Sequence, residues 1–195
     1  VRLRTSRLSR SVEFYTEMLG LSLLASGDGL VSLGVLDAPL LLLEEASDAR
    51  PRPPRTTGLY HFAILMPTRY HLARSLQRLV ERRYPIQGAA DHLVSEAVYL
   101  ADPDGNGIEI YADRPRSAWP VTGGEIRMTT DPLDVDGLMA ELRQDGGPWQ
   151  GLAGGTVMGH VHLQVHNLAA AEAFYCDVLG FDLMQRYGGS ALFVA

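Results

Sequence analysis

The beginning of this chain recurs near its end. Shifted by 160 residues, eight positions within residues 1–23 carry the same residue type in both copies. The matching pairs are Val1 and Val161, Leu3 and Leu163, Leu8 and Leu168, Phe14 and Phe174, Tyr15 and Tyr175, Leu19 and Leu179, Gly20 and Gly180, and Leu23 and Leu183. Each copy has the pattern of a strand followed by a helix that ends in Leu-Gly, where glycine suits a helix C-cap. A unit used repeatedly must pack against its copies, because one unit alone cannot bury its apolar face.

Hydrophobic periodicity predicts three such units, the last of them cut short. A proline-rich linker over 46–57 follows the first unit, and a long segment rich in Pro, Gly and Asp follows the second. The first unit is expected to have a strand over 1–6, a helix over 9–19 and strands over 21–25, 30–35 and 40–44. The second is expected to have a strand over 60–66, a helix over 70–82 and strands at 86–87, 97–100 and 107–111.

These units predict an α+β fold of paired βαβββ units that form a half-barrel, with a second such domain begun but incomplete. We expect an N-terminal domain over 1–113, a connector over 114–156 with one helix near 135–143, and the first part of a second domain over 157–195. The chain opens with a strand in progress and stops inside another strand over 191–195. Half-finished sheets leave apolar faces uncovered, so we expect a piece of a longer protein.

Composition excludes several classes of function. A net charge of −6 gives no basic face for nucleic acid, and no apolar run approaches the length of about 20 residues that a membrane helix requires. The single cysteine, Cys176, excludes internal disulfides and favours a reducing cytoplasm. Phosphate loops, nucleophile elbows and dinucleotide fingerprints are absent from the sequence. The sequence leaves open whether the protein forms a homo-oligomer.

Polar side chains share one face of two predicted strands. In the strand over 60–66, the even-numbered residues form a continuous apolar face for the following helix, which leaves His61 on the opposite face. In the third unit, His160 and His162 likewise alternate with apolar residues expected to face a helix. A row of polar side chains on a concave sheet favours a wet cavity. The alternative for each histidine is a hydrogen-bonded structural residue or an exposed edge.

Glu109 is a candidate for a carboxylate ligand on the same cavity. It stands between two isoleucines in the strand after the Asp-Pro-Asp-Gly turn, and an unpaired glutamate is rarely buried. Two imidazoles and one carboxylate on a cavity would form a facial triad with open positions, which suits Fe(II). The alternative for Glu109 is a solvent-facing sheet end. His92 is either a turn residue or a side chain at the cavity mouth.

With these residues the chain resembles the vicinal oxygen chelate superfamily, which includes glyoxalase I, bleomycin resistance proteins and type I extradiol ring-cleavage dioxygenases. The resemblance rests on the strand-helix-three-strand units, on the two FYxxxLG helices and on the segment DPDGNGIEIY, and it covers nearly the whole chain. The segments GLYHFAILMPTR and MGHVHLQVHNL look more specifically like the two-domain catechol 2,3-dioxygenase-like branch.

The resemblance implies paired units around a divalent metal. His61 and Glu109 match ligand positions of the second unit, and His160 matches the opening histidine of the third. The implied activity is cleavage of a small aromatic diol of the catechol type with O₂. Fe(II) is the implied metal, Mn, Zn or Ni the alternatives, and His92 or His162 would assist proton transfer. Which domain holds the metal stays open.

Two other functions stay open as well. One is a glyoxalase-like lyase or isomerase, which a convergence of Glu44 on the same centre would favour. The other is a metal-free binding protein of the bleomycin-resistance kind.

Overall fold

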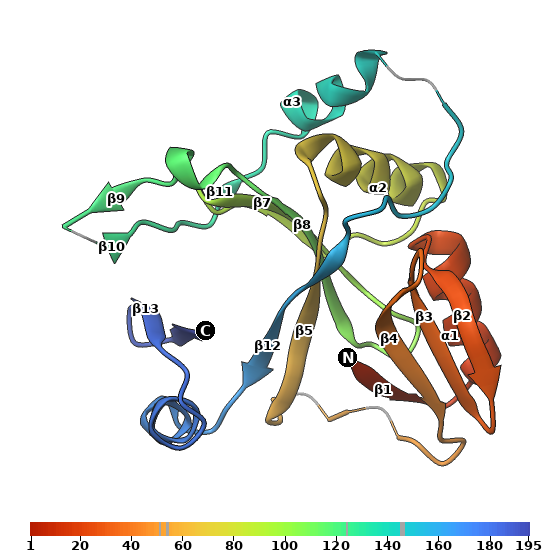
Figure 1. Ribbon diagram of the computed structural model, residues 1–195, viewed down its shortest axis with the longest axis horizontal. Helices are drawn as coiled ribbons and strands as arrows, with labels where there is room; N and C mark the ends of the chain where they lie inside the picture. Colours follow the sequence, from red (N-terminus) through yellow and green to blue (C-terminus); the bar gives the residue numbers. More distant parts are fainter. Residues whose placement is uncertain (51, 54, 124, 145–146) are drawn as a thin grey trace.

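The structure is a computed structural model, shown in Figure 1. It describes residues 1–50, 52–53, 55–123, 125–144 and 147–195. Pro51 and Pro54 of the predicted linker lie outside the described residues. The strands are β1 (Arg2–Thr5), β2 (Ser22–Gly27), β3 (Leu30–Val35), β4 (Ala38–Glu45), β5 (Gly58–Leu65), β6 (Gly88–Asp91), β7 (Ser95–Ala101), β8 (Gly107–Asp113), β9 (Val121–Thr122), β10 (Glu125–Ile126), β11 (Asp131–Pro132), β12 (Val157–Gln164), β13 (Leu183–Tyr187) and β14 (Ala191–Val194). The α-helices are α1 (Leu8–Glu13), α2 (Arg69–Glu81), α3 (Val135–Ala140) and α4 (Leu168–Glu172).

The first unit forms its own four-stranded sheet. Its strand order is β1-β4-β3-β2, with β1 parallel to β4 and the other pairs antiparallel. The helix expected over 9–19 is confirmed: α1 continues directly into the π-helical turn η1 (Phe14–Met18). Gly20 follows with a φ of +85°, and an added Cβ there would lie 2.7 Å from the Cα of Gly151. The predicted glycine stop is therefore required both by backbone conformation and by close packing.

The second unit repeats this plan in a six-stranded sheet with the order β11-β6-β7-β8-β5-β12. Strand β5 is parallel to β8, as β1 is to β4. Helix α2 begins after Thr68, whose side chain caps the helix by accepting a hydrogen bond from the backbone N–H of His71. The strand expected at 86–87 is displaced, since β6 begins only at Gly88.

The open edge of β5 is occupied by β12, the first strand of the third unit. The two strands run antiparallel, with Val161 beside Phe62 and His162 beside His61, and Figure 1 shows them side by side. This pairing satisfies backbone groups that an open edge would leave without partners. The predicted domains over 1–113, 114–156 and 157–195 stay a prediction. Strand β12, at the predicted start of the second domain, continues the sheet of the second unit.

A single core joins the first two units. Phe62 and Ile64 on the even-numbered face of β5 are almost completely buried, which confirms the face predicted to carry the helix. Tyr15 of η1 packs beside Phe62, with ring centroids 6.4 Å apart, and its hydroxyl donates to Asp102 (2.8 Å). The Asp-Pro-Asp-Gly turn of the second unit is thereby fastened to the helix of the first.

The third unit is packed much less tightly. Its predicted helix and two following strands are present, but β13 and β14 form a separate hairpin. Val161 and Leu163, expected to face a helix, are exposed, because α4 lies beyond the end of β12 and contacts β14. The connector contains the expected helix as α3, which packs on α2. Among the described residues, no helix is long and apolar enough to cross a membrane.

Candidate metal centre

Three neighbouring strands place the predicted ligands around one alanine. Ala63 in the middle of β5 is in register with Glu109 of β8 on one side and with His160 of β12 on the other. His61 lies two residues before Ala63 and therefore on the same face of the sheet. Ala63 is fully buried, and its short side chain lies between its two register partners. The strand register thus brings together all three residues predicted as metal ligands.

The three ligand atoms form a nearly equilateral triangle. The Nε2 of His61 lies 3.0 Å from the Oε2 of Glu109, the Nε2 of His160 lies 3.3 Å from the same oxygen, and the two Nε2 atoms are 3.3 Å apart. An ion bonded to each at about 2.1 Å would hold such atoms about 3.0 Å apart in an octahedron and about 3.4 Å apart in a tetrahedron. The triangle therefore fits a divalent transition metal of either geometry, and the two-histidine, one-carboxylate set is that of a facial triad.

Burial and charge make this triangle asymmetric. His61 and Glu109 are buried, whereas His160 is largely exposed. Burial by itself would raise the pKa of Glu109, but hydrogen bonds from His160 and His61 outweigh it and lower the pKa to about 2. The carboxylate is therefore ionised at neutral pH, as a metal ligand must be. Access from solvent is on the His160 side.

His162, predicted as a proton-transfer residue, lies next to the triangle without joining it. Its ring stands at 87° to the ring of His61, with centroids 4.8 Å apart. Burial, followed by the nearby imidazoles of His61 and His160, lowers the pKa of His162. Tyr60 closes the same corner, because its ring contacts both His61 and His162. The position of His162 is compatible with its predicted role, and the role itself stays a prediction.

His92, the other predicted proton-transfer residue, reaches the centre only through Tyr99. Its Nε2 is 2.7 Å from the Tyr99 hydroxyl, and its Nδ1 is 2.7 Å from the carbonyl oxygen of Thr129 in the connector. Tyr99 is in register with Glu109, and burial together with the charge of Glu109 raises the pKa of Tyr99. The sequence analysis missed Tyr99, because its place beside Glu109 follows from the strand register and not from the pattern of β7 alone.

Tyr111 completes the aromatic surroundings. Its ring lies 5.2 Å from that of His160, and burial raises the pKa of its hydroxyl. Gly159, the residue before His160, leaves the space that the Tyr111 hydroxyl occupies, since an added Cβ would lie 2.1 Å from that oxygen. The glycine therefore lets Tyr111 pack beside the exposed ligand.

Glu44, whose convergence would have favoured a glyoxalase-like function, lies elsewhere. It is in β4 of the first sheet and pairs with Arg2, whose Nε is 3.0 Å from its carboxylate. Among the described residues, the group suited to a metal ion consists of His61, Glu109 and His160 without Glu44.

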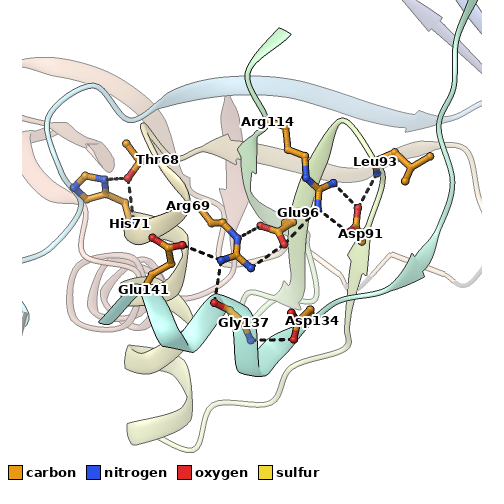
Figure 2. Close-up of polar contacts among 10 residues, drawn as sticks. All are labelled: Thr68, Arg69, His71, Asp91, Leu93, Glu96, Arg114, Asp134, Gly137 and Glu141. Atoms are coloured by element: carbon orange, nitrogen blue, oxygen red, sulfur yellow. Dashed lines mark hydrogen bonds and ion pairs between the residues drawn. The ribbon is translucent and has the colours of Figure 1, made fainter. Parts of the chain in front are cut away.

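An ionic network around the buried Glu96 holds the connector against the second unit, as Figure 2 shows. Glu96 of β7 lies between the guanidinium groups of Arg69 and Arg114, with 2.5 Å to the Nε of Arg69. Arg69 also donates to the carbonyl of Gly137 in α3, at 2.9 Å. Arg114 makes a two-pronged contact with Asp91, at 2.6 and 2.7 Å. The segment carrying Thr129, and with it the contact to His92, is thus fixed from both sides.

Curated relatives of this chain are dioxygenases by name. It is 47% identical over 199 residues to "Catechol-2,3-dioxygenase" of Bacillus subtilis (strain 168), covering 100% of this chain and 68% of the relative. It is 29% identical over 119 residues to "Biphenyl-2,3-diol 1,2-dioxygenase 2" of Rhodococcus globerulus, covering 58% of this chain and 60% of the relative. The chain therefore spans roughly two thirds of the length of these relatives.

Solved structures show the same fold. A glyoxalase/dioxygenase from Nostoc punctiforme superposes with a TM-score of 0.52 at 24% identity, covering 59% of this chain and 89% of that one. The family described as "Glyoxalase/Bleomycin resistance protein/Dioxygenase superfamily" matches residues 1–110 and 157–194, which include all three residues of the triangle. This match confirms the family expected from the sequence and the α+β fold of repeated units. The chain belongs to the glyoxalase/bleomycin resistance protein/dioxygenase superfamily.

Proposed function

We propose that this chain carries the metal centre of an extradiol ring-cleavage dioxygenase that opens a catechol-type aromatic diol with O₂. The observation that carries the proposal is the triangle of His61, Glu109 and His160. The names of both curated relatives support the same reaction class. We further propose Fe(II) as the metal, because two imidazoles and one carboxylate on one face are the set typical of Fe(II) oxygenases.

The chain's own residues supply position and surroundings. A bound divalent metal would supply the Lewis acidity and the redox chemistry that joining a catechol to O₂ requires. His61 and Glu109 are fixed by their burial in adjacent strands, so they bring a preformed half of the site. The exposed His160 lies on the side from which a small aromatic substrate would enter.

Two hydrogen-bonding groups beside the triangle are our candidates for moving protons. A carbonyl oxygen only accepts, so the Nδ1 of His92 donates to Thr129, and its Nε2 shares a hydrogen bond with the hydroxyl of Tyr99, which also contacts Glu109. Tyr99 is therefore held in one orientation beside Glu109. His162 stands on the opposite side, against the ring of His61. We propose that His162 and the Tyr99–His92 pair assist the deprotonation of the diol and the protonation of the product.

Oxygen uptake with catechol tests the reaction class. The purified protein, loaded anaerobically with Fe(II) and then mixed with catechol, should consume one O₂ for each catechol opened. The variant Tyr99→Phe should bind iron as the wild type does but turn over more slowly, by about 10²- to 10⁴-fold if the hydroxyl takes part in proton transfer.

The control is His166→Ala, which alters an exposed histidine just beyond β12 and should retain full activity. Iron-loaded protein that consumes no O₂ with catechol or with 2,3-dihydroxybiphenyl would contradict the proposed reaction. Selective activation by Zn²⁺ or Ni²⁺ on a thiohemiacetal substrate would instead support the glyoxalase-like alternative.

A further inference from the structure

A groove rich in arginine lies between the first unit and the beginning of the second sheet. It encloses about 650 Å³ and is lined by residues of β1, of the segment before α1, of the linker and of the Asp-Pro-Asp-Gly turn. Its five arginines are Arg4, Arg7, Arg10, Arg50 and Arg52. The chain as a whole carries a net charge of −6, so this concentration of positive charge opposes the overall balance.

The positive charge of the groove is mostly uncompensated. Asp104 is the carboxylate in the lining, and it is already paired with Arg10, at 2.5 Å. Glu44, the register partner of Arg4, is paired with Arg2 instead. Within the part of the chain that the structure describes, no ion pair involves Arg4, Arg7 or Arg50.

Two of the arginines are already held by contacts within the chain, Arg10 by its ion pair with Asp104 and Arg52 by uncharged acceptors. Arg52 donates to the carbonyl of Leu59 and to the side-chain oxygen of Gln164, neither of which neutralises its charge. A guanidinium group presents several N–H donors in one plane, which suits the two oxygens of a carboxylate or phosphate.

Three flat side chains also line the groove, beside the polar Ser6 and Asn106. Pro53, Pro103 and the half-exposed ring of Tyr60 lie among the arginines. The Tyr60 ring also contacts His61 and His162, so it forms a wall shared by the groove and the metal centre. An aromatic ring and proline rings offer stacking surface to a planar body, while guanidinium groups stack on aromatic faces as well.

We propose that this groove binds a small organic anion, in which a carboxylate or phosphate group is attached to a flat apolar body. The anionic group pairs with the guanidinium groups of Arg4 and Arg7, and the flat body packs against Tyr60 and the prolines. This site is separate from the metal triangle and does not depend on the proposed dioxygenase reaction.

Calorimetric titration of the metal-free protein tests the proposal. Because no metal is needed for this assay, its result does not depend on whether the protein is a dioxygenase. Benzoate and phenyl phosphate carry the two candidate anionic groups on the same ring, and benzyl alcohol is the neutral counterpart. At least one of the two anions should bind saturably, and more tightly than inorganic phosphate, while benzyl alcohol should not bind. The affinity should fall with added salt.

The variant Arg7→Gln should weaken binding of the anion by about tenfold or more, the usual effect of losing one charge-assisted hydrogen bond. Arg143→Gln removes an equal charge from an exposed position outside the groove and should leave binding unchanged. Circular dichroism confirms that both variants fold. The proposal is wrong if neither anion binds, if benzyl alcohol binds as tightly, or if the two variants behave alike.

Discussion

Glu96 is a buried carboxylate that contacts the guanidinium groups of both Arg69 and Arg114. Removing its charge therefore tests whether this ionic network holds the connector in place. The side chain is almost fully buried and accepts from the Nε and the NH2 nitrogen of Arg69, at 2.5 and 3.1 Å. Arg114 approaches to 3.5 Å. Glu96→Gln keeps the size of the side chain, removes the charge and turns an amide NH₂ toward a guanidinium donor (Figure 2).

The expected loss of stability follows from these contacts. Breaking a fully buried ion pair costs about 3–5 kcal/mol, because a charge is left without a partner. Here Arg69 and Arg114 are each about one third exposed and keep other acceptors, Gly137 and Asp91 respectively. Water therefore replaces part of the interaction, and we expect a loss of about 2 kcal/mol. For a chain of this size that loss lowers the melting temperature by about 4–8 °C.

Urea unfolding followed by circular dichroism measures the effect. With a slope of about 2 kcal/mol/M, the midpoint should fall by about 1 M. The matched control is Glu141→Gln, which removes a carboxylate from the same guanidinium of Arg69 but at a more exposed position; its cost should stay below about 1 kcal/mol. If Glu96→Gln lowers the midpoint no more than Glu141→Gln does, burial does not set the strength of this network.

Three further substitutions test the sheet and the site. Gly107→Ala should lower both the free energy of unfolding and the metal affinity, because the added Cβ would lie 2.2 Å from a carbonyl oxygen of β5. The control is Gly88→Ala, whose added Cβ would have no neighbouring atom within 4 Å and should be tolerated in the same assays. Ala63→Leu should abolish metal binding measured by calorimetry while the circular dichroism spectrum is retained, since a larger side chain between Glu109 and His160 should force the ligand atoms apart. Asp91→Asn should reduce the acid sensitivity of unfolding: hydrogen bonds from Arg114 lower the pKa of Asp91, so its contribution is full above the ordinary value of 3.8 and is lost as the pH falls through the lower folded value. Parallel stability curves of wild type and Asp91→Asn from pH 5 to pH 2 would contradict this assignment.

The sequence predicted individual units better than their association. Alternation in β5 correctly predicted that Phe62 and Ile64 face the core and that His61 faces away, since period-2 patterning directly reflects the two faces of a strand. The opening strands β1, β5 and β12 have similar patterns, however, and pattern alone does not say which edges meet. The pairing of β5 with β12 is decided by packing and backbone hydrogen bonds, which leave little trace in composition.

The same distinction applies to the site. His61, Glu109 and His160 were predictable because ionisable residues within apolar strands are conspicuous. Tyr99 and Ala63 were not, because a tyrosine and an alanine are ordinary in a strand and acquire their roles only through register. The sequence left open whether an N-terminal or a C-terminal domain holds the metal; we propose a centre that the second unit shares with β12, because His61, Glu109 and His160 lie together.

The central claim is that His61 and Glu109 of the second unit hold one metal ion together with His160 of β12. Elemental analysis of the purified wild type and of His61→Ala, Glu109→Ala, His160→Ala and His166→Ala measures this directly. We predict about one divalent ion per chain in the wild type and in His166→Ala, and close to none in each of the other three. Full retention of the metal by His160→Ala would contradict the claim, because it would show that β12 does not contribute to the centre.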